Sequence, residues 1–132
     1  TGNPLALLHC ILNYPTKDEN ANLAMILDLK KNFPKYPIGY SDHTLPGDMK
    51  NLEIAVLLGA SIIEKHFRQY GYSFQEIFDI LLQNGFKLFR FSEKKIIWRI
   101  SELYVPCNED ILAISNVDDF LNRTKYELRQ VM

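Results

Sequence analysis

The sequence predicts an α/β fold: a β-α-β-α-β unit followed by a smaller α+β segment that holds a helix and a β-hairpin. In the first half, short apolar runs of strand length alternate with helical patterns. Each of these runs ends at or near one of the chain's three histidines, His9, His43 and His66. The pattern changes near Arg68. We therefore predict a first segment over residues 1–67 and a second over 68–132.

The first segment is predicted to contain three strands joined by short connections. The strands are expected over residues 5–12, 38–43 and 61–67, each an apolar run with polar residues at its end. Because β-α-β crossovers are right-handed, the three strands should be parallel. Their carboxyl ends would then meet at one edge of the sheet, where α/β folds place their sites.

Two helices are predicted between these strands. Asn20 is expected to cap the first, which presents Leu23, Ile26 and Leu27 on one face and ends near Phe33. The second is predicted over residues 49–58 and is closed by a glycine.

The second segment is predicted to begin with a capped helix. Ser73 and Glu76 form a capping-box pattern, in which each side chain binds the other residue's backbone N–H group. Two strands around a polar turn, 86–91 and 96–100, indicate a hairpin. A further strand is predicted over 110–115, and residues beyond 116 are expected to be partly helical.

Composition excludes several classes of partner. Hydrophobic residues make up 47% of the 132 residues and charged residues 23%, as in globular proteins. A net charge of -1 gives no electrostatic reason for a nucleic-acid or membrane partner. Cys10 and Cys107 form no CxxC pattern, which favours a reducing compartment, the cytoplasm. The start at Thr1, close to a strand, predicts that the chain is a fragment.

The histidines at the strand ends are candidate metal ligands. Two neutral imidazoles with open coordination positions suit Mn²⁺, Mg²⁺ or Zn²⁺, and Asp42 could orient a ligand or bind a sugar hydroxyl. The alternative is that each histidine only binds loops at its strand end. Strand alternation sends Glu64 and His66 to one side and Lys65 to the other. On spacing alone, an ion pair with a loop is the favoured role for this charged cluster. No catalytic residue is assigned.

Residues 5–67 resemble the sialic acid synthase family, which makes N-acetylneuraminate, legionaminate and pseudaminate. The matching words, in order, are Leu7-Leu8-His9-Cys10, Tyr14-Pro15-Thr16, Ala21-Asn22-Leu23, Gly39-Tyr40-Ser41-Asp42-His43-Thr44, Gly59-Ala60 and Ile63-Glu64-Lys65-His66-Phe67.

The resemblance implies the carboxyl-terminal part of a (β/α)₈ TIM barrel. Such a barrel condenses phosphoenolpyruvate with an N-acetylated amino sugar to a nonulosonic acid, for surface polysaccharide. It also implies that His43 and His66 bind a divalent metal, Mn²⁺ or Mg²⁺. By the same resemblance, Ser41 contacts phosphoenolpyruvate, Glu64 contacts the sugar, and Tyr14 contacts a substrate. A homo-oligomer is left open, and little activity is expected of this chain alone.

Residues 70–115 show a weaker resemblance to the carboxyl-terminal end of FkbM-type methyltransferases. The matching words are Tyr70-Gly71-Tyr72-Ser73, Glu76-Ile77-Phe78, Leu82-Gln83-Asn84-Gly85-Phe86-Lys87-Leu88-Phe89-Arg90 and Asp110-Ile111-Leu112-Ala113-Ile114. One alternative is therefore a fragment of an S-adenosylmethionine-dependent methyltransferase, although the cofactor's glycine-rich loop is not in this sequence. Another is a non-catalytic α/β domain that places all strands in one mixed sheet.

Overall fold

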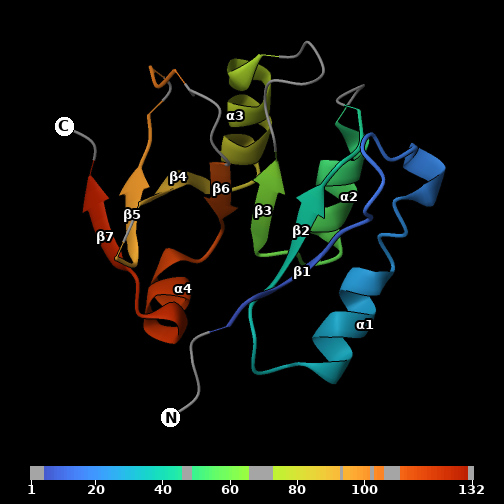
Figure 1. Ribbon diagram of the computed structural model, residues 1–132, viewed down its shortest axis with the longest axis horizontal. Coiled ribbons are helices and arrows are strands. Elements are labelled where there is room, and N and C mark those ends of the chain that lie inside the picture. Colours follow the sequence, from blue (N-terminus) through green and yellow to red (C-terminus); the bar gives the residue numbers. More distant parts are fainter. Residues whose placement is uncertain are drawn as a thin grey trace.

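A computed structural model describes residues 5–45, 49–65, 73–92, 94–101, 103–105 and 111–130. Its seven strands form one mixed sheet in the order β1-β2-β3-β6-β4-β5-β7 (Figure 1). The strands are β1 Leu7–His9, β2 Ile38–Asp42, β3 Ile62–Lys65, β4 Lys87–Ser92, β5 Ile96–Arg99, β6 Ile111–Ile114 and β7 Glu127–Gln130. The helices are α1 Met25–Asn32, α2 Lys50–Leu57, α3 Phe74–Gln83 and α4 Val117–Thr124, with a 3₁₀ turn at Asp18–Asn20. The predicted α/β class is confirmed.

The first three strands are parallel neighbours, as the β-α-β-α-β pattern predicts. Leu8 of β1 pairs with Gly39 of β2, and Gly39 pairs in turn with Ile62 of β3. Gly39 is required by this close approach, because a Cβ atom there would lie 2.5 Å from the Ile62 carbonyl oxygen. The carboxyl ends of β1, β2 and β3 therefore lie together at one edge of the sheet.

The second half of the chain continues the same sheet. β6 pairs antiparallel with β3, placing Ala113 opposite Ile63, and it also pairs antiparallel with β4. One mixed sheet is the arrangement that the small-domain alternative expects. The residues around the predicted boundary at Arg68 lie outside the described residues, so the division into two domains stays a prediction.

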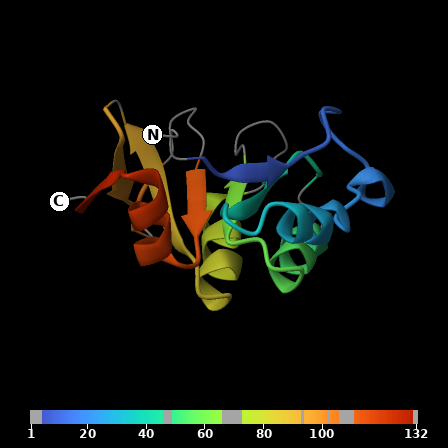
Figure 2. The same ribbon diagram turned by 90° about the horizontal axis from the view of Figure 1, so that it is seen from below.

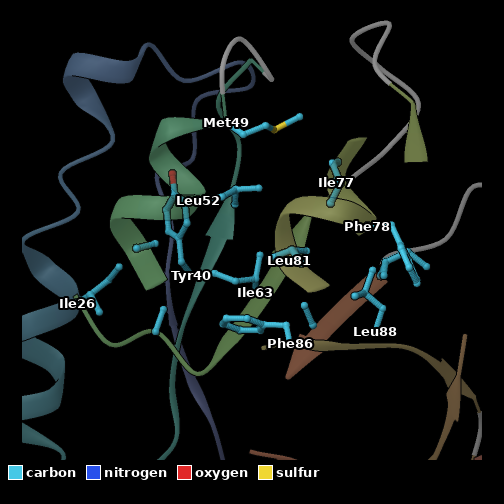
Figure 3. Close-up of a cluster of buried hydrophobic side chains, with 14 of the residues drawn as sticks. Ile26, Tyr40, Met49, Leu52, Ile63, Ile77, Phe78, Leu81, Phe86 and Leu88 are labelled. Carbon is cyan, nitrogen blue, oxygen red and sulfur yellow. The ribbon is translucent and has the colours of Figure 1, made fainter. Parts of the chain in front are cut away.

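Each face of the sheet has its own apolar core. On one face, side chains of α1, α2 and α3 pack against Tyr40 and Ile63, in the cluster drawn in Figure 3. On the other face, Phe120 of α4 packs against Ile62 and Phe89. Figure 2 shows α1, α2 and α3 along one side of the sheet. Among the described residues, no helix has the length and apolar character needed to cross a membrane.

The beginning of the chain differs from the prediction. The expected strand over 5–12 is only three residues long, and Leu12 is 89% exposed. β1 has only β2 as a neighbour, and the chain leaves the sheet before the cis Tyr14–Pro15 bond. The chain leaves β1 after His9 although the neighbouring β2 continues to Asp42, so the predicted strand was too long.

The first helix also begins later than predicted. Asn20 ends the 3₁₀ turn and caps nothing, while α1 has Ala24 at its N-cap without a side-chain bond. Asn22 has a positive φ of 51°, which breaks the expected helix between these points. Ile26 is buried as expected, but Leu27 is half exposed.

The second segment follows its prediction closely up to residue 115. Ser73 and Glu76 form both bonds of the capping box. Gly85 follows the end of α3 and has a φ of 81°, as is common after a helix. The predicted hairpin is β4 and β5, paired antiparallel. Beyond α4, the sequence analysis missed β7, whose four residues are all exposed at the edge of the sheet.

Ser73→Ala is expected to lower the free energy of unfolding by about 1 kcal/mol at neutral pH. Backbone and side-chain bonds from Ser73 lower the pKa of the Glu76 carboxyl. A lowered folded-state pKa contributes stability above the unfolded value, and this stability is lost as the pH falls through the folded value. The difference between wild type and variant, measured by urea unfolding, should therefore shrink in acid. Ser101→Ala, at an exposed serine outside the helices, is the control. The variant keeps the backbone bond to Glu76, which is the larger cause of the lowered pKa. A difference that does not change with pH would therefore show that the Ser73 hydroxyl does not contribute to this pKa.

Candidate functional site

Four of the residues proposed from the sequence lie in contact at the carboxyl ends of the parallel strands β2 and β3. The ring of Tyr14 meets the ring of His43 edge-on, with centroids 4.5 Å apart. His43 Nε2 lies 3.3 Å from Ser41 Oγ, and the Ser41 hydroxyl donates a hydrogen bond to the Glu64 carboxylate. Ser41 and Glu64 are register partners on β2 and β3, so they share one face of the sheet.

The same face of the sheet also carries α4. However, α4 begins near the amino end of β3, whereas Ser41 and Glu64 lie near the carboxyl ends of β2 and β3. Glu64 is opposite Leu112, which belongs to the apolar cluster under α4. α4 follows Ile114, and Ile114 pairs with Ile62 at the amino end of β3. The contacting set from Tyr14 to Glu64 therefore lies at the end of the sheet opposite to the start of α4.

The hydrogen bonds of His43 determine the position of its ring proton. Nδ1 lies 2.8 Å from the carbonyl oxygen of Ile11, which can only accept, so Nδ1 carries the proton. In the neutral ring, Nε2 then has a lone pair. Nε2 lies within hydrogen-bond distance of the Ser41 hydroxyl, which itself donates to Glu64. A ring held by a backbone carbonyl with the other nitrogen available is the arrangement common to metal-binding histidines.

His9 has a different environment. Its register partner is Tyr40, which places it on the face covered by α1, α2 and α3. Its Nε2 lies 2.8 Å from the carbonyl oxygen of Ala21, and its ring stacks on Tyr40 at 5.9 Å. His9 therefore binds a loop at its strand end and faces away from Ser41 and Glu64.

Asp42 does not face the site, contrary to the interpretation that it orients a ligand or binds a sugar. It is 3% exposed on the helix-covered face and forms an ion pair with Lys65, which is 2% exposed. Its Oδ1 accepts hydrogen bonds from Tyr40 Oη at 3.1 Å, from Thr44 N at 2.9 Å and from Thr44 Oγ1 at 2.7 Å. The prediction that Lys65 faces away from Glu64 is confirmed.

Tyr40 is a donor within this buried network. Burial, and then the neighbouring Asp42 carboxylate, raise the pKa of the Tyr40 phenol above its usual range. The phenol is therefore protonated at neutral pH and donates to Asp42. Figure 3 shows its ring inside the core, with the hydroxyl directed toward the carboxyl end of β2.

His66, the second proposed metal ligand, lies outside the described residues. Within the part of the chain that the structure describes, no three His, Cys, Asp or Glu side chains come together as a metal site. Of the two proposed metal ligands, the structure therefore describes only His43. A His43 ring held at Nδ1 by the Ile11 carbonyl, with Nε2 directed toward Ser41, fits a role as a metal ligand.

The sequence model of the NeuB family matches residues 1–71, more than half of the chain. The chain belongs to the NeuB family.

Three of the relatives that match this chain are named as synthases. The chain is 45% identical over 62 residues to N-acetylneuraminate-9-phosphate synthase of Drosophila melanogaster, covering 47% of this chain and 16% of that protein. It is 48% identical over 63 residues to N,N'-diacetyllegionaminic acid synthase of Legionella pneumophila, covering 48% and 17%. It is 44% identical over 63 residues to pseudaminic acid synthase of Helicobacter pylori, covering 48% and 18%. The chain thus spans less than a fifth of each of these relatives.

The chain also shows a likeness to a crystal structure of a spore coat polysaccharide biosynthesis protein E from Chromobacterium violaceum. The TM-score is 0.42 and the sequence identity is 20%, over 63% of this chain and 35% of that one.

The feature of the NeuB segment that sequence reasoning missed is the buried network of Tyr40, Asp42, Thr44 and Lys65. A signal for it was present. Alternation places Asp42 and Lys65 on the face opposite to Ser41 and Glu64, and their opposite charges at adjacent strand ends indicate a pair.

Proposed function

We propose that residues 5–67 form part of a (β/α)₈ barrel synthase that condenses phosphoenolpyruvate with an N-acetylated amino sugar to a nonulosonic acid. The product would serve surface polysaccharide biosynthesis, and the reaction would take place in the cytoplasm. The relatives that match this segment are named as synthases of such acids, which supports the substrate class. The single mixed sheet also fits the non-catalytic alternative, but the names of these relatives favour a synthase.

One observation carries this proposal: Tyr14, His43, Ser41 and Glu64 form an unbroken line of contacts at the carboxyl ends of the parallel strands. In α/β folds this is where catalytic groups are placed. The four side chains supply an aromatic edge, an imidazole, a hydroxyl and a carboxylate, which together suit a polar, hydroxylated substrate.

Each residue has a distinct proposed role. Ser41 contacts phosphoenolpyruvate through its hydroxyl, and Glu64 accepts hydrogen bonds from sugar hydroxyls with the lone pairs that Ser41 leaves open. Tyr14 contacts a substrate and limits the movement of the His43 ring, against which it packs. The Ile11 carbonyl keeps the His43 proton on Nδ1, so that Nε2 faces the site.

A divalent metal, Mn²⁺ or Mg²⁺, would be held by His43 and His66. When bound, it would supply Lewis-acid polarisation of the sugar aldehyde. The remaining ligands and the oligomeric state are not assigned.

Metal titration of the whole chain tests this proposal. Calorimetry with Mn²⁺ is expected to show binding that His43→Ala or His66→Ala weakens by about 100-fold or more, since each removes a ligand. His9→Gln is the matched control, because its imidazole lies at a neighbouring strand end but binds Ala21. Unchanged affinity in the His43 and His66 variants, or equal loss in the His9 variant, would contradict the assignment.

A further inference from the structure

The ion pair of Asp42 and Lys65 lies directly behind the proposed site. Asp42 and Lys65 are register partners, and the adjacent register partners are Ser41 and Glu64. Because side chains alternate along a strand, the charged pair faces the helices while Ser41 and Glu64 face the site. Ser41 and Glu64 thus link the ends of β2 and β3 on one face of the sheet. Asp42 and Lys65 link them on the other face.

Hydrogen bonds from several parts of the chain hold Asp42 and Lys65 in one arrangement. Lys65 Nζ donates to Asp42 Oδ2 and to the carbonyl oxygen of Thr44, 3.1 Å away. The other carboxylate oxygen receives the Tyr40 hydroxyl and both the amide and the hydroxyl of Thr44. The donors come from β2, from β3 and from the segment that follows β2.

Stability is a poor explanation for such a pair. Both charges are nearly fully buried beside the apolar core of Figure 3. Removing two charges from water costs about as much as their attraction returns, and an apolar pair of similar size is often equally or more stable. What a buried, directional network adds is a single geometry.

That geometry is transmitted to the site through the backbone. His43 lies between Asp42 and Thr44, and the network binds the Asp42 carboxylate and the amide, hydroxyl and carbonyl of Thr44. The His43 carbonyl oxygen accepts a further bond from Thr16 N at 2.8 Å. Both peptide neighbours of His43 are therefore fixed, and Lys65 connects them to the end of β3 that carries Glu64.

We infer that Asp42 and Lys65 form a positioning pair, which fixes the ends of β2 and β3. This keeps His43 hydrogen-bonded to the Ile11 carbonyl and Ser41 hydrogen-bonded to Glu64. The pair itself touches no substrate and acts through His43, Ser41 and Glu64. The inference rests on the proposed function in assigning them to one site.

The test compares wild type with the double variant Asp42→Asn, Lys65→Met by ¹⁵N NMR of the histidine rings at one pH. The asparagine oxygen can accept from the same three donors, and the charges of both Asp42 and Lys65 are removed, so the fold should persist. The wild-type His43 ring is expected as one Nδ1–H tautomer, assigned by its absence in His43→Gln. The double variant is expected to show a mixture of tautomers. Mn²⁺ affinity should fall about tenfold, the scale of lost support for a metal ligand.

Phe120→Leu is the matched control, because it weakens the core on the other face without touching the network. It should lower stability and leave the His43 tautomer unchanged. A single Nδ1–H tautomer in the folded double variant would overturn the inference. If the double variant does not fold, Thr44→Val decides in the same way, because it removes one donor to Asp42. The tautomer needs no metal, so failure of Mn²⁺ binding in wild type would overturn the proposed function and leave the positioning test intact.

Discussion

Replacing Lys65 alone with methionine is expected to lower the free energy of unfolding by about 3–5 kcal/mol. Methionine has nearly the length of lysine, so little packing is lost. The loss arises because the Asp42 carboxylate stays buried, at 3% exposure, with no cation beside it. Urea unfolding of both proteins, followed by circular dichroism, gives the difference. The single variant should therefore be less stable than the double variant with Asp42→Asn, in which the charge of Asp42 is removed as well.

Glu127→Gln is the matched control for this prediction. It removes one charge from the pair of Glu127 and Arg129, whose side chains are 63% and 46% exposed. An exposed pair of this kind contributes only about 0–1 kcal/mol. Equal losses in the buried and the exposed pair would show that burial does not set the energetics of Asp42.

Local patterns were sufficient to predict most of the elements. The capping box of Ser73 and Glu76 needs only residues three apart, and the turn after β4 needs only a short polar stretch. The beginning of the chain could not be predicted in this way. The register places Ile11 beside Asp42, the last residue of β2, so β1 ends although its neighbour continues. The apolar residues Ile11 and Leu12 give no local sign of this end.

The candidate site was also predictable in part. Alternation along β3 correctly separates Glu64 from Lys65, and neighbouring parallel strand ends bring Ser41 and His43 beside Glu64. Asp42 was misinterpreted because an acidic residue beside a histidine suggests a ligand. Its partner, Lys65, is 23 residues away and is brought to it only by the register of β2 and β3.

The pairing of β3 with β6 was the main feature of the fold that sequence could not supply. These strands are joined by a segment that holds a helix and a hairpin, and nothing in either strand specifies the other as a partner. As a result, Ile62 of the first segment packs in one cluster with Phe89, Phe120 and Leu112 of the second. If that cluster is the structural link, the two segments should unfold together.

Phe89→Ala tests this link and is expected to lower the free energy of unfolding by about 3–5 kcal/mol, because it opens a cavity in the shared cluster. Unfolding is followed by fluorescence of Trp98, the only tryptophan, which reports on the second segment, and by NMR signals of His9, which report on the first. In one cooperative unit, both midpoints move to lower urea by the same amount. Phe91→Ala on the same strand is the control: at 44% exposure its loss should be only about 1 kcal/mol. A Trp98 midpoint that falls while the His9 midpoint stays would instead establish residues 1–67 and 68–132 as separate domains, with the β3–β6 pairing adding little to either.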